Sequence, residues 1–273
     1  MRVKIVVGAS ALLAITIVSA IVFVSRTPAI APTTSGIPVL AYHSIMPREF
    51  YYPLNVDNPW ILLDEVFYEQ MRYLYENGFN AVTTRQLKDF LFHEVHLPEN
   101  AIVITFDDGY LDNYLYAAPI LRKFGFTAMM FLITNAIQET TPAMTAYPTQ
   151  FMSTAEILAS VDVFEHGSHS HAMHLALGGV PPMVNESVEN IRADLRQSFE
   201  APLTFTTGFA YPHGRYSDNA LTALALEGVQ FAFTTHVGYV YRDTEPLLLP
   251  RFSVTSDWTM EMFSDIVWGR GQR

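Results

Sequence analysis

Two short stretches of this sequence concentrate side chains that can bind a metal ion and transfer protons. Asp107 and Asp108 stand side by side directly after an apolar run. Further along the chain come four closely spaced histidines: His166, His169, His171 and His174. A carboxylate with two histidines leaves an open position on a metal ion, and a metal ion lowers the pKa of a bound water to about 7. The pattern therefore predicts a metal-assisted hydrolase with Asp107 or Asp108 as the base, while spacing alone leaves the ligand pair open.

The elements that must position these groups follow from the apolar pattern. Strands are expected at 37–44, 81–84, 101–106, 127–134, 163–169, 207–212 and 230–235, with helices at 63–79, 85–93, 111–125, 184–199 and 217–228. This alternation indicates an α/β fold with a parallel sheet covered by helices, and the length permits closure into a barrel. Chemistry in such folds gathers at the carboxyl ends of the strands. His43, the aspartate pair, the histidines and the "YPHG" turn all follow predicted strands.

Composition narrows the classes of partner and site. The formal net charge of −11 argues against nucleic acid as a partner. The chain has no cysteine, so it can form neither disulfides nor a thiolate metal site, and any metal must be held by His, Asp or Glu. No linker or internal repeat interrupts the sequence from residue 37 onward, which predicts one domain over 37–273.

The N-terminus carries an uncharged apolar run from Ile5 to Val24. Twenty helical residues span roughly 30 Å, enough to cross the hydrocarbon core of a membrane. Arg2 and Lys4 precede this run, which places the N-terminus in the cytoplasm. We therefore expect a cytoplasmic tip and a single transmembrane anchor over 1–25, a linker over 26–36, and a catalytic domain on the outer side of the cell membrane. The alternative is a signal segment cleaved after Ala31, which would release the domain.

Three motifs resemble those of one known family. "TFDDGY", "GSHSHAMHL" and "FAYPHGRY" are similar to the first, second and third motifs of the polysaccharide deacetylases, the NodB-homology group of carbohydrate esterase family 4. The resemblance implies a distorted (β/α) barrel that removes acetyl groups from N-acetylglucosamine polymers. It also implies that Asp107 is the general base, that Asp108 binds one divalent metal ion, and that the backbone N–H of Tyr211 stabilises the oxyanion. Zinc is the expected metal, with cobalt or nickel as alternatives.

The sequence departs from the common family pattern in its second histidine. The usual spacing would place that ligand at Met173, whereas His169 and His174 stand five residues apart, as in the circularly rearranged subgroup that resembles poly-N-acetylglucosamine deacetylases. The resemblance thus assigns His169 and His174 as ligands. His166 and His171 are then bystanders or support the ligands.

Two further departures concern the acid and the residue that holds the base. The late Leu-x-His motif is missing, and in the rearranged subgroup the corresponding histidine lies early, at His43 in "LAYHSI". Ala210 stands where the family often has an arginine beside the base, and Arg251 is the candidate replacement. His43 would protonate the leaving amine, because an amine leaves poorly unless it is protonated.

The expected activity is N-deacetylation of a cell-wall or extracellular polysaccharide that contains N-acetylglucosamine. Tyr110 and Trp258 are candidates for stacking on sugar rings, although core packing explains each equally well. Two alternatives stay open: another metal-dependent amide hydrolase, such as an imidase or deacylase, on the same fold, and a non-catalytic carbohydrate-binding module. The intact aspartate pair, histidine pair and His43 favour an enzyme.

Overall fold

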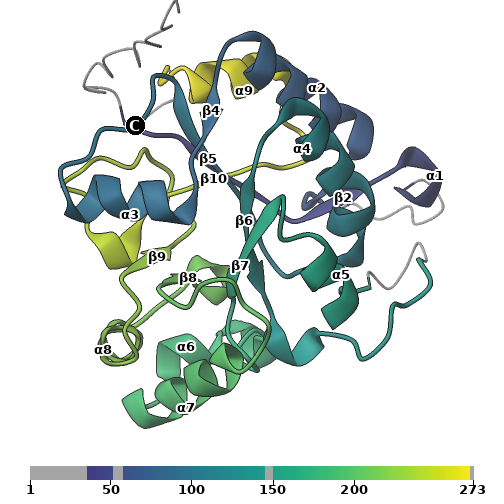
Figure 1. Cartoon of the computed structure of the whole chain (residues 1–273). Coiled ribbons are helices and arrows are strands. Elements are labelled where there is room, and N and C mark those ends of the chain that lie inside the picture. Colours follow the sequence, from purple (N-terminus) through teal and green to yellow (C-terminus); the bar gives the residue numbers. More distant parts are fainter. Residues whose placement is uncertain (1–35, 52–57, 145–149, 271–273) are drawn as a thin grey trace, which may run out of the picture.

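A computed structural model describes residues 36–51, 58–144 and 150–270 of the chain. Strands and helices alternate through these ranges, as the sequence predicts (Figure 1). The strands are β1 Val39–Tyr42, β2 Ser44–Met46, β3 Ile61–Leu63, β4 Asn80–Ala81, β5 Ala101–Phe106, β6 Ala128–Leu132, β7 Phe164–Ser168, β8 Gly208–Ala210, β9 Phe231–Phe233 and β10 Phe252–Ser253. The α-helices are α1 Arg48–Tyr51, α2 Asp64–Glu76, α3 Thr84–Phe92, α4 Ala118–Phe124, α5 Thr154–Ala159, α6 Pro182–Asn185, α7 Val188–Phe199, α8 Asp218–Leu226 and α9 Met260–Val267. A π-helix covers Asn113–Ala117, and 3-10 turns cover Thr134–Ala136, Leu177–Gly179, Pro212–Gly214 and Pro246–Leu248.

The main sheet is parallel and open. Its order is β10-β1-β5-β6-β7-β8-β9, with β4 paired to β5. Among the described residues, β9 and β10 form no ladder, and an isolated bridge between Phe233 and Leu249 joins β9 to the segment before β10. The α/β class is confirmed, while the expected barrel is only a half-barrel. Strands as short as β9 and β10 offer few pairing sites with which to close it.

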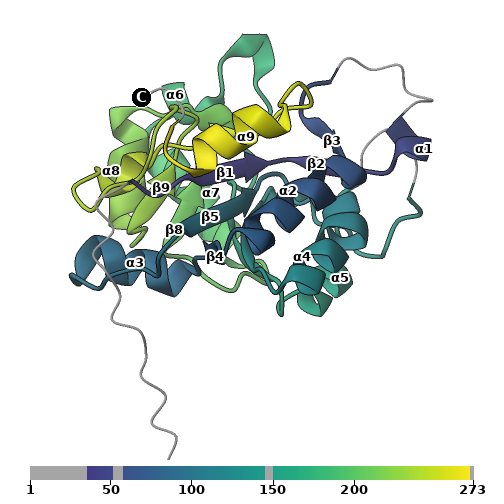
Figure 2. The same cartoon turned by 90° about the horizontal axis from the view of Figure 1, so that it is seen from above.

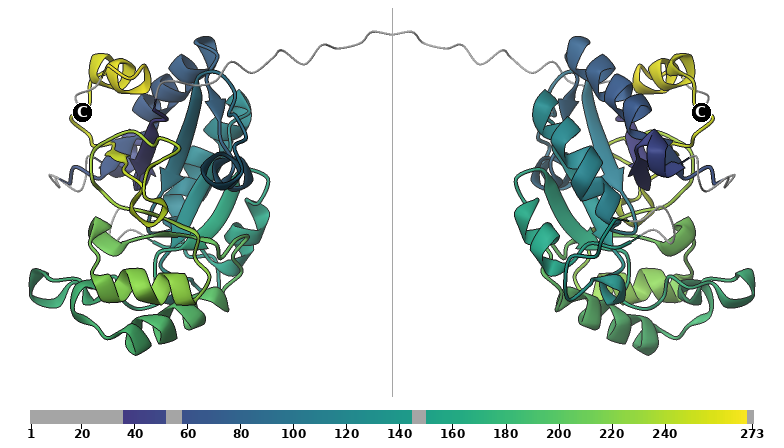
Figure 3. Two further views of the ribbon diagram at one scale, coloured as in Figure 1. Left: turned by 90° about the vertical axis from the view of Figure 1, so that its left-hand side faces the viewer. Right: turned by 90° about the vertical axis from the view of Figure 1, so that its right-hand side faces the viewer.

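Alternation along the strands divides the core into two sides. Ile102, Ile104 and Phe106 of β5 pack with buried residues of α2, α4, α5 and α9. Val103 points to the opposite face of the sheet, where it belongs to a second cluster of buried side chains. Leu87 and Phe90 of α3 are part of this second cluster. A third cluster joins α7 and α8, which lie together at one end of the molecule (Figure 3).

Helix caps explain two boundaries that differ from expectation. Thr83 caps α3 in a capping box with Gln86, so the strand expected over 81–84 is reduced to Asn80–Ala81. Ser187 accepts the N–H of Asn190 and starts α7, so the helix expected over 184–199 is divided into α6 and α7.

The strand expected over 37–44 breaks at His43. β1 pairs with β5 and β10, whereas β2 leaves this sheet and pairs with β3. Six strands and α-helices in the described part of the chain lie wholly or mostly outside the segments predicted from the sequence: β2, β3, β10, α1, α5 and α9. Helix α9 returns to lie beside α2, where Ser264 and Tyr73 share a hydrogen bond of 2.7 Å between their hydroxyls (Figure 2).

The predicted membrane anchor lies outside the described residues. So do the cytoplasmic tip and all but the last residue of the expected linker. Among the residues that the structure does describe, no helix has the length and apolar character needed to cross a membrane.

Candidate active site

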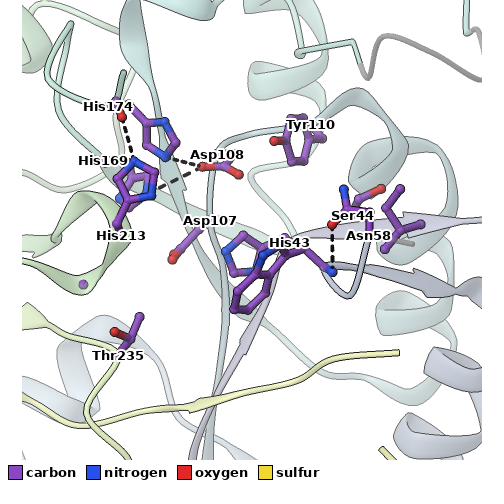
Figure 4. Close-up of a pocket in the computed structure, with 13 residues that line it drawn as sticks. His43, Ser44, Asn58, Asp107, Asp108, Tyr110, His169, His174, His213 and Thr235 are labelled. Carbon is purple, nitrogen blue, oxygen red and sulfur yellow. Dashed lines mark hydrogen bonds and ion pairs between the residues drawn. The ribbon is translucent and has the colours of Figure 1, made fainter. Parts of the chain in front are cut away.

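A cavity of about 360 Å³ opens at the carboxyl ends of the strands. Its wall combines polar groups from the segments that directly follow β1, β5, β7, β8 and β9 (Figure 4). The lining residues are His43, Ser44, Asn58, Trp60, Ile61, Asp107, Asp108, Tyr110, His169, His174, His213, Gly214 and Thr235. The tertiary structure therefore brings His43, both aspartates and the predicted histidine pair into one pocket.

Asp108, His169 and His174 form a triad suited to a metal ion. One ligand atom from each lies within 4.8 Å of the others. Oδ1 of Asp108 lies 3.1 Å from Nε2 of His174 and 3.6 Å from Nε2 of His169. The carboxylate lies between the histidines and the rest of the pocket, so its oxygen and the two ring nitrogens converge on one point (Figure 4).

Backbone contacts fix which nitrogen of His169 faces Asp108. Nδ1 of His169 lies 2.7 Å from the carbonyl oxygen of Ala210, which can only accept, so Nδ1 carries the proton and donates it. Nε2 of the neutral ring is then unprotonated, and its lone pair points toward Asp108. This is the arrangement by which metal-binding histidines are held in one tautomer and orientation.

A turn at Ser170 brings His174 back to His169. Ser170, two residues after the end of β7, has a φ of 73°, in the left-handed region. The buried carboxylate of Asp194, on α7, then accepts the backbone N–H groups of His171 and Ala172 at 2.8 and 2.7 Å. Asp194 thus anchors the turn that carries His174. Asp194 was not predicted, because nothing in a helical segment marks a carboxylate that caps a distant loop.

Asp107 is held by Arg251, as predicted. The guanidinium donates two hydrogen bonds, of 2.8 and 2.7 Å, to the two carboxylate oxygens. Arg251 is fully buried and also donates to the carbonyl of Thr234 and the hydroxyl of Thr105. Burial acts to raise the pKa of Asp107, but the adjacent Arg251 charge and its hydrogen bonds outweigh it, so this pKa is lowered.

The turn after β5 directs the two aspartates differently. The N–H of Asp107 still donates to Tyr42 of β1, whereas Asp108 and Gly109 have φ values of 74° and 84°. The positive φ of Gly109 would strain any other residue, and a Cβ atom there would also come within 2.6 Å of the Leu132 side chain, so the turn favours glycine. Asp107 therefore meets Arg251 while Asp108 meets the histidines.

His43 lies across the pocket from the histidine pair (Figure 4). Its ring is half-buried and packs against Trp60 with a centroid separation of 4.6 Å. Nδ1 of His43 is buried without a hydrogen-bond partner among the described residues. Trp60 was not predicted, and a lone tryptophan at the start of a short strand offers no signal that would single it out.

The prediction for Tyr211 is wrong. Its backbone N–H donates to the carbonyl of Phe233 at 3.0 Å, and Tyr211 does not line the pocket. The sheet contact between β8 and β9 extends one residue past Ala210, and this contact uses the N–H that was expected to stabilise the oxyanion.

The neighbouring side chains divide into bystanders and lining residues. His166 is fully buried, with Nε2 3.3 Å from the hydroxyl of Ser160, and His171 contacts Thr134; neither lines the pocket. Tyr110 does line it, whereas Trp258 is absent from the lining and packs against the core. His213, which was not predicted, lies against His174 with ring centroids 4.6 Å apart and donates from Nε2 to the His174 carbonyl.

Comparisons with known proteins place this site in a family. The sequence profile described as "Polysaccharide deacetylase" matches residues 94–232, which include both aspartates and the histidine cluster. The chain belongs to the polysaccharide deacetylase family. It is therefore a hydrolase that acts on the N-acetyl amide bond of polysaccharides.

Individual relatives agree with this membership. YxkH of Bacillus subtilis (strain 168), whose name refers to the same family, is 30% identical over 223 residues, or 80% of this chain and 71% of that protein. The poly-β-1,6-N-acetyl-D-glucosamine N-deacetylase of Staphylococcus epidermidis is 27% identical over 206 residues, covering 71% of this chain and 68% of that protein. The structure of IcaB from Ammonifex degensii shares the fold with a TM-score of 0.71 at 22% identity, covering 87% of this chain and 98% of IcaB.

Proposed function

We propose that this protein is a metal-dependent N-deacetylase of a cell-wall or extracellular polysaccharide that contains N-acetylglucosamine. The observation that carries the proposal is the pairing of Asp107 with Arg251 directly beside the triad of Asp108, His169 and His174. Similarity to an N-deacetylase of poly-β-1,6-N-acetyl-D-glucosamine supports a polymer of this sugar as substrate.

The triad has the chemistry of a divalent metal site. Two imidazole nitrogens and one carboxylate oxygen suit zinc, and also cobalt or nickel. Oδ1 of Asp108 is buried and accepts no hydrogen bond from the described residues, although two histidine nitrogens lie near it. Nε2 of His169 carries a lone pair that faces the Asp108 carboxylate oxygen, and these two electron-rich atoms repel each other. A cation bound between them would relieve that repulsion. A bound metal ion would make a coordinated water acidic and polarise the acetamide carbonyl.

Asp107 is the proposed general base. Arg251 holds its carboxylate in place and lowers its pKa, so Asp107 stays ionised at neutral pH and can accept a proton from the attacking water. The two oxygens cannot rotate freely, since each is bonded to a separate guanidinium nitrogen. Arg251 thus positions the base.

His43 is the proposed general acid. It lies in the same pocket as Asp107 but on the opposite side from His169 and His174 (Figure 4). Amide hydrolysis needs an acid separate from the base, because the leaving nitrogen must gain a proton as the C–N bond breaks. A histidine open to the cavity can make that transfer and then regain a proton from solvent.

The proposed location is the outer face of the cell membrane, with the Ile5–Val24 segment as a single anchor. The length and lack of charge of this segment support the proposal. Protease treatment of intact cells should degrade the catalytic domain, whereas a full-length protein that is soluble and protected in the cytoplasm would contradict it.

Acetate release tests the proposed activity. The full-length protein is incubated with poly-β-1,6-N-acetylglucosamine, chitin oligomers and peptidoglycan, and released acetate is quantified by mass spectrometry. We expect release from at least one polymer, loss of release after chelation, and recovery when zinc is added. No release from any of them by a zinc-loaded, folded preparation would overturn the proposed function.

A further inference from the structure

Two buried polar side chains hold the backbone that carries His43. Asp112 and Asn113 are both fully buried and follow the aspartate pair in sequence. The side-chain amide of Asn113 donates to the backbone carbonyl of His43 at 2.7 Å. The carboxylate of Asp112 accepts a hydrogen bond from the hydroxyl of Ser44. Two successive residues, 43 and 44, are thus bound to one turn of another element.

The backbone needs such support at this point. β1 ends at Tyr42 and β2 begins at Ser44 in a different sheet, so His43 falls in the gap between two ladders. The imidazole itself contacts Trp60, and its Nδ1 has no hydrogen-bond partner among the described residues. The position of the His43 imidazole therefore depends on the hydrogen bonds that hold the backbone of His43.

The local helix geometry matches this function. Asn113 begins the π-helix that runs to Ala117, before the chain continues as α4. A π-helical turn contains an extra residue, and such turns occur frequently at functional sites. Here the turn presents two adjacent polar side chains, those of residues 112 and 113, to the same short segment of backbone.

We propose that Asn113, together with Asp112, is a positioning residue for His43 in the deacetylation reaction. This inference rests on the proposed function, because it takes His43 to be the general acid. Asn113 does not line the pocket and acts through the backbone of His43. It links the acid to the same β5–α4 connection that supplies the base and a metal ligand, so one segment sets the distance between both sides of the pocket.

The test compares two substrates that differ in their need for an acid. Asn113→Leu removes the donor while keeping a similar shape. We expect kcat for acetate release from the glycan to fall about 10-fold to 100-fold with KM little changed, because small displacements of a catalytic group cost this much. Hydrolysis of p-nitrophenyl acetate should change less than 3-fold (roughly the noise expected from a conservative change), since nitrophenolate leaves without protonation.

A double-variant comparison separates positioning from a general structural defect. In the His43→Ala background, Asn113→Leu should have no further effect on glycan deacetylation, because the two residues act as one unit. Gln70→Met is the matched control: Gln70 is another fully buried amide, and its side chain accepts a hydrogen bond from the hydroxyl of Tyr42 rather than binding the backbone of His43. This control should lower thermal stability without changing the ratio of the two activities.

If Asn113→Leu does not fold, Ser44→Ala, which removes the hydroxyl bonded to Asp112, decides the question with a smaller loss of the same selectivity. Equal loss on both substrates, an unchanged glycan rate, or a loss that persists in the His43→Ala background would overturn the inference. These results are distinct from failure of the proposed function, which would appear as absence of acetate release by the unmodified protein.

Discussion

Arg251 holds the side chain of Asp107 with two hydrogen bonds inside the core, whereas His43, across the same pocket, is held through its backbone. His169 resembles Asp107 in this respect, because its ring donates to the carbonyl of Ala210. The loop that carries His174 is anchored by Asp194. The proposed base and metal ligands are therefore each held by their own hydrogen bonds or by an anchored loop, whereas the proposed acid is held only through its backbone.

This difference fits the separate demands on the two sides. A base and a set of metal ligands must keep one geometry and one charge state, and buried hydrogen bonds provide both. A proton donor must be reloaded from water after each turnover, so its ring has to stay accessible. His43 is only half-buried, in contrast to Asp107 and His169, which are 3% and 2% exposed.

The largest expected effect is on the metal side. His169→Ala or His174→Ala leaves two protein ligands, and metal affinity should fall by more than about 100-fold, the upper range for loss of a supporting partner. His171→Ala should retain its metal, although His171 is also in the cluster. Elemental analysis of the purified variants measures this. Full occupancy in His174→Ala with loss in His171→Ala would show that the ligand pair is wrong.

On the acid side, His43→Ala should leave metal content intact and reduce the rate of glycan deacetylation by about 10² to 10⁴. The variants on the two sides of the pocket would then have different defects. Those of His169 and His174 would lose the metal ion, whereas His43→Ala would keep it and lose only turnover. Single-turnover acetate release and elemental analysis on one preparation report both quantities. Wild-type activity in folded His43→Ala would end its assignment as the acid.

Arg251→Met should destabilise the fold more than any single change at His43. It leaves the Asp107 carboxylate buried without its partner, which costs about 3–5 kcal/mol. Urea unfolding of the metal-free protein measures the loss. The double variant Arg251→Met with Asp107→Leu should recover part of the stability, because no charge is then buried, and failure to recover any would contradict this account of the pair.

The smallest expected effect concerns a histidine in the same cluster but outside the pocket. Burial lowers the pKa of His166 from its ordinary 6.5 to about 4. The unfolded chain then binds a proton more readily below pH 6.5, so acidification from pH 7.5 to 5 should cost about 2 kcal/mol of stability. His166→Phe should reduce this pH dependence in urea unfolding with chelator present. An identical dependence in both proteins would show that His166 does not contribute.

The sequence by itself determined the classes of residue and the order of the elements. Alternating apolar strands and amphipathic helices predicted a parallel α/β sheet, and adjacent aspartates after a strand predicted a site at its carboxyl end. The cluster of four histidines likewise predicted a metal site, although spacing alone left the ligand pair open and only the family resemblance selected His169 and His174. Such local patterns are readable because each depends on a few consecutive residues.

Tertiary structure alone decided which distant groups meet. Arg251 and Asp107 are 144 residues apart, and they pair because β10 lies beside β1, which lies beside β5. Trp60 reaches His43 because β2 leaves the main sheet to pair with β3. The N–H of Tyr211 is used within the sheet because the backbone contact with β9 continues one residue past the end of β8. Each outcome depends on pairing between strands, and strand pairing is set by the packing of the whole sheet, which no short stretch of sequence encodes.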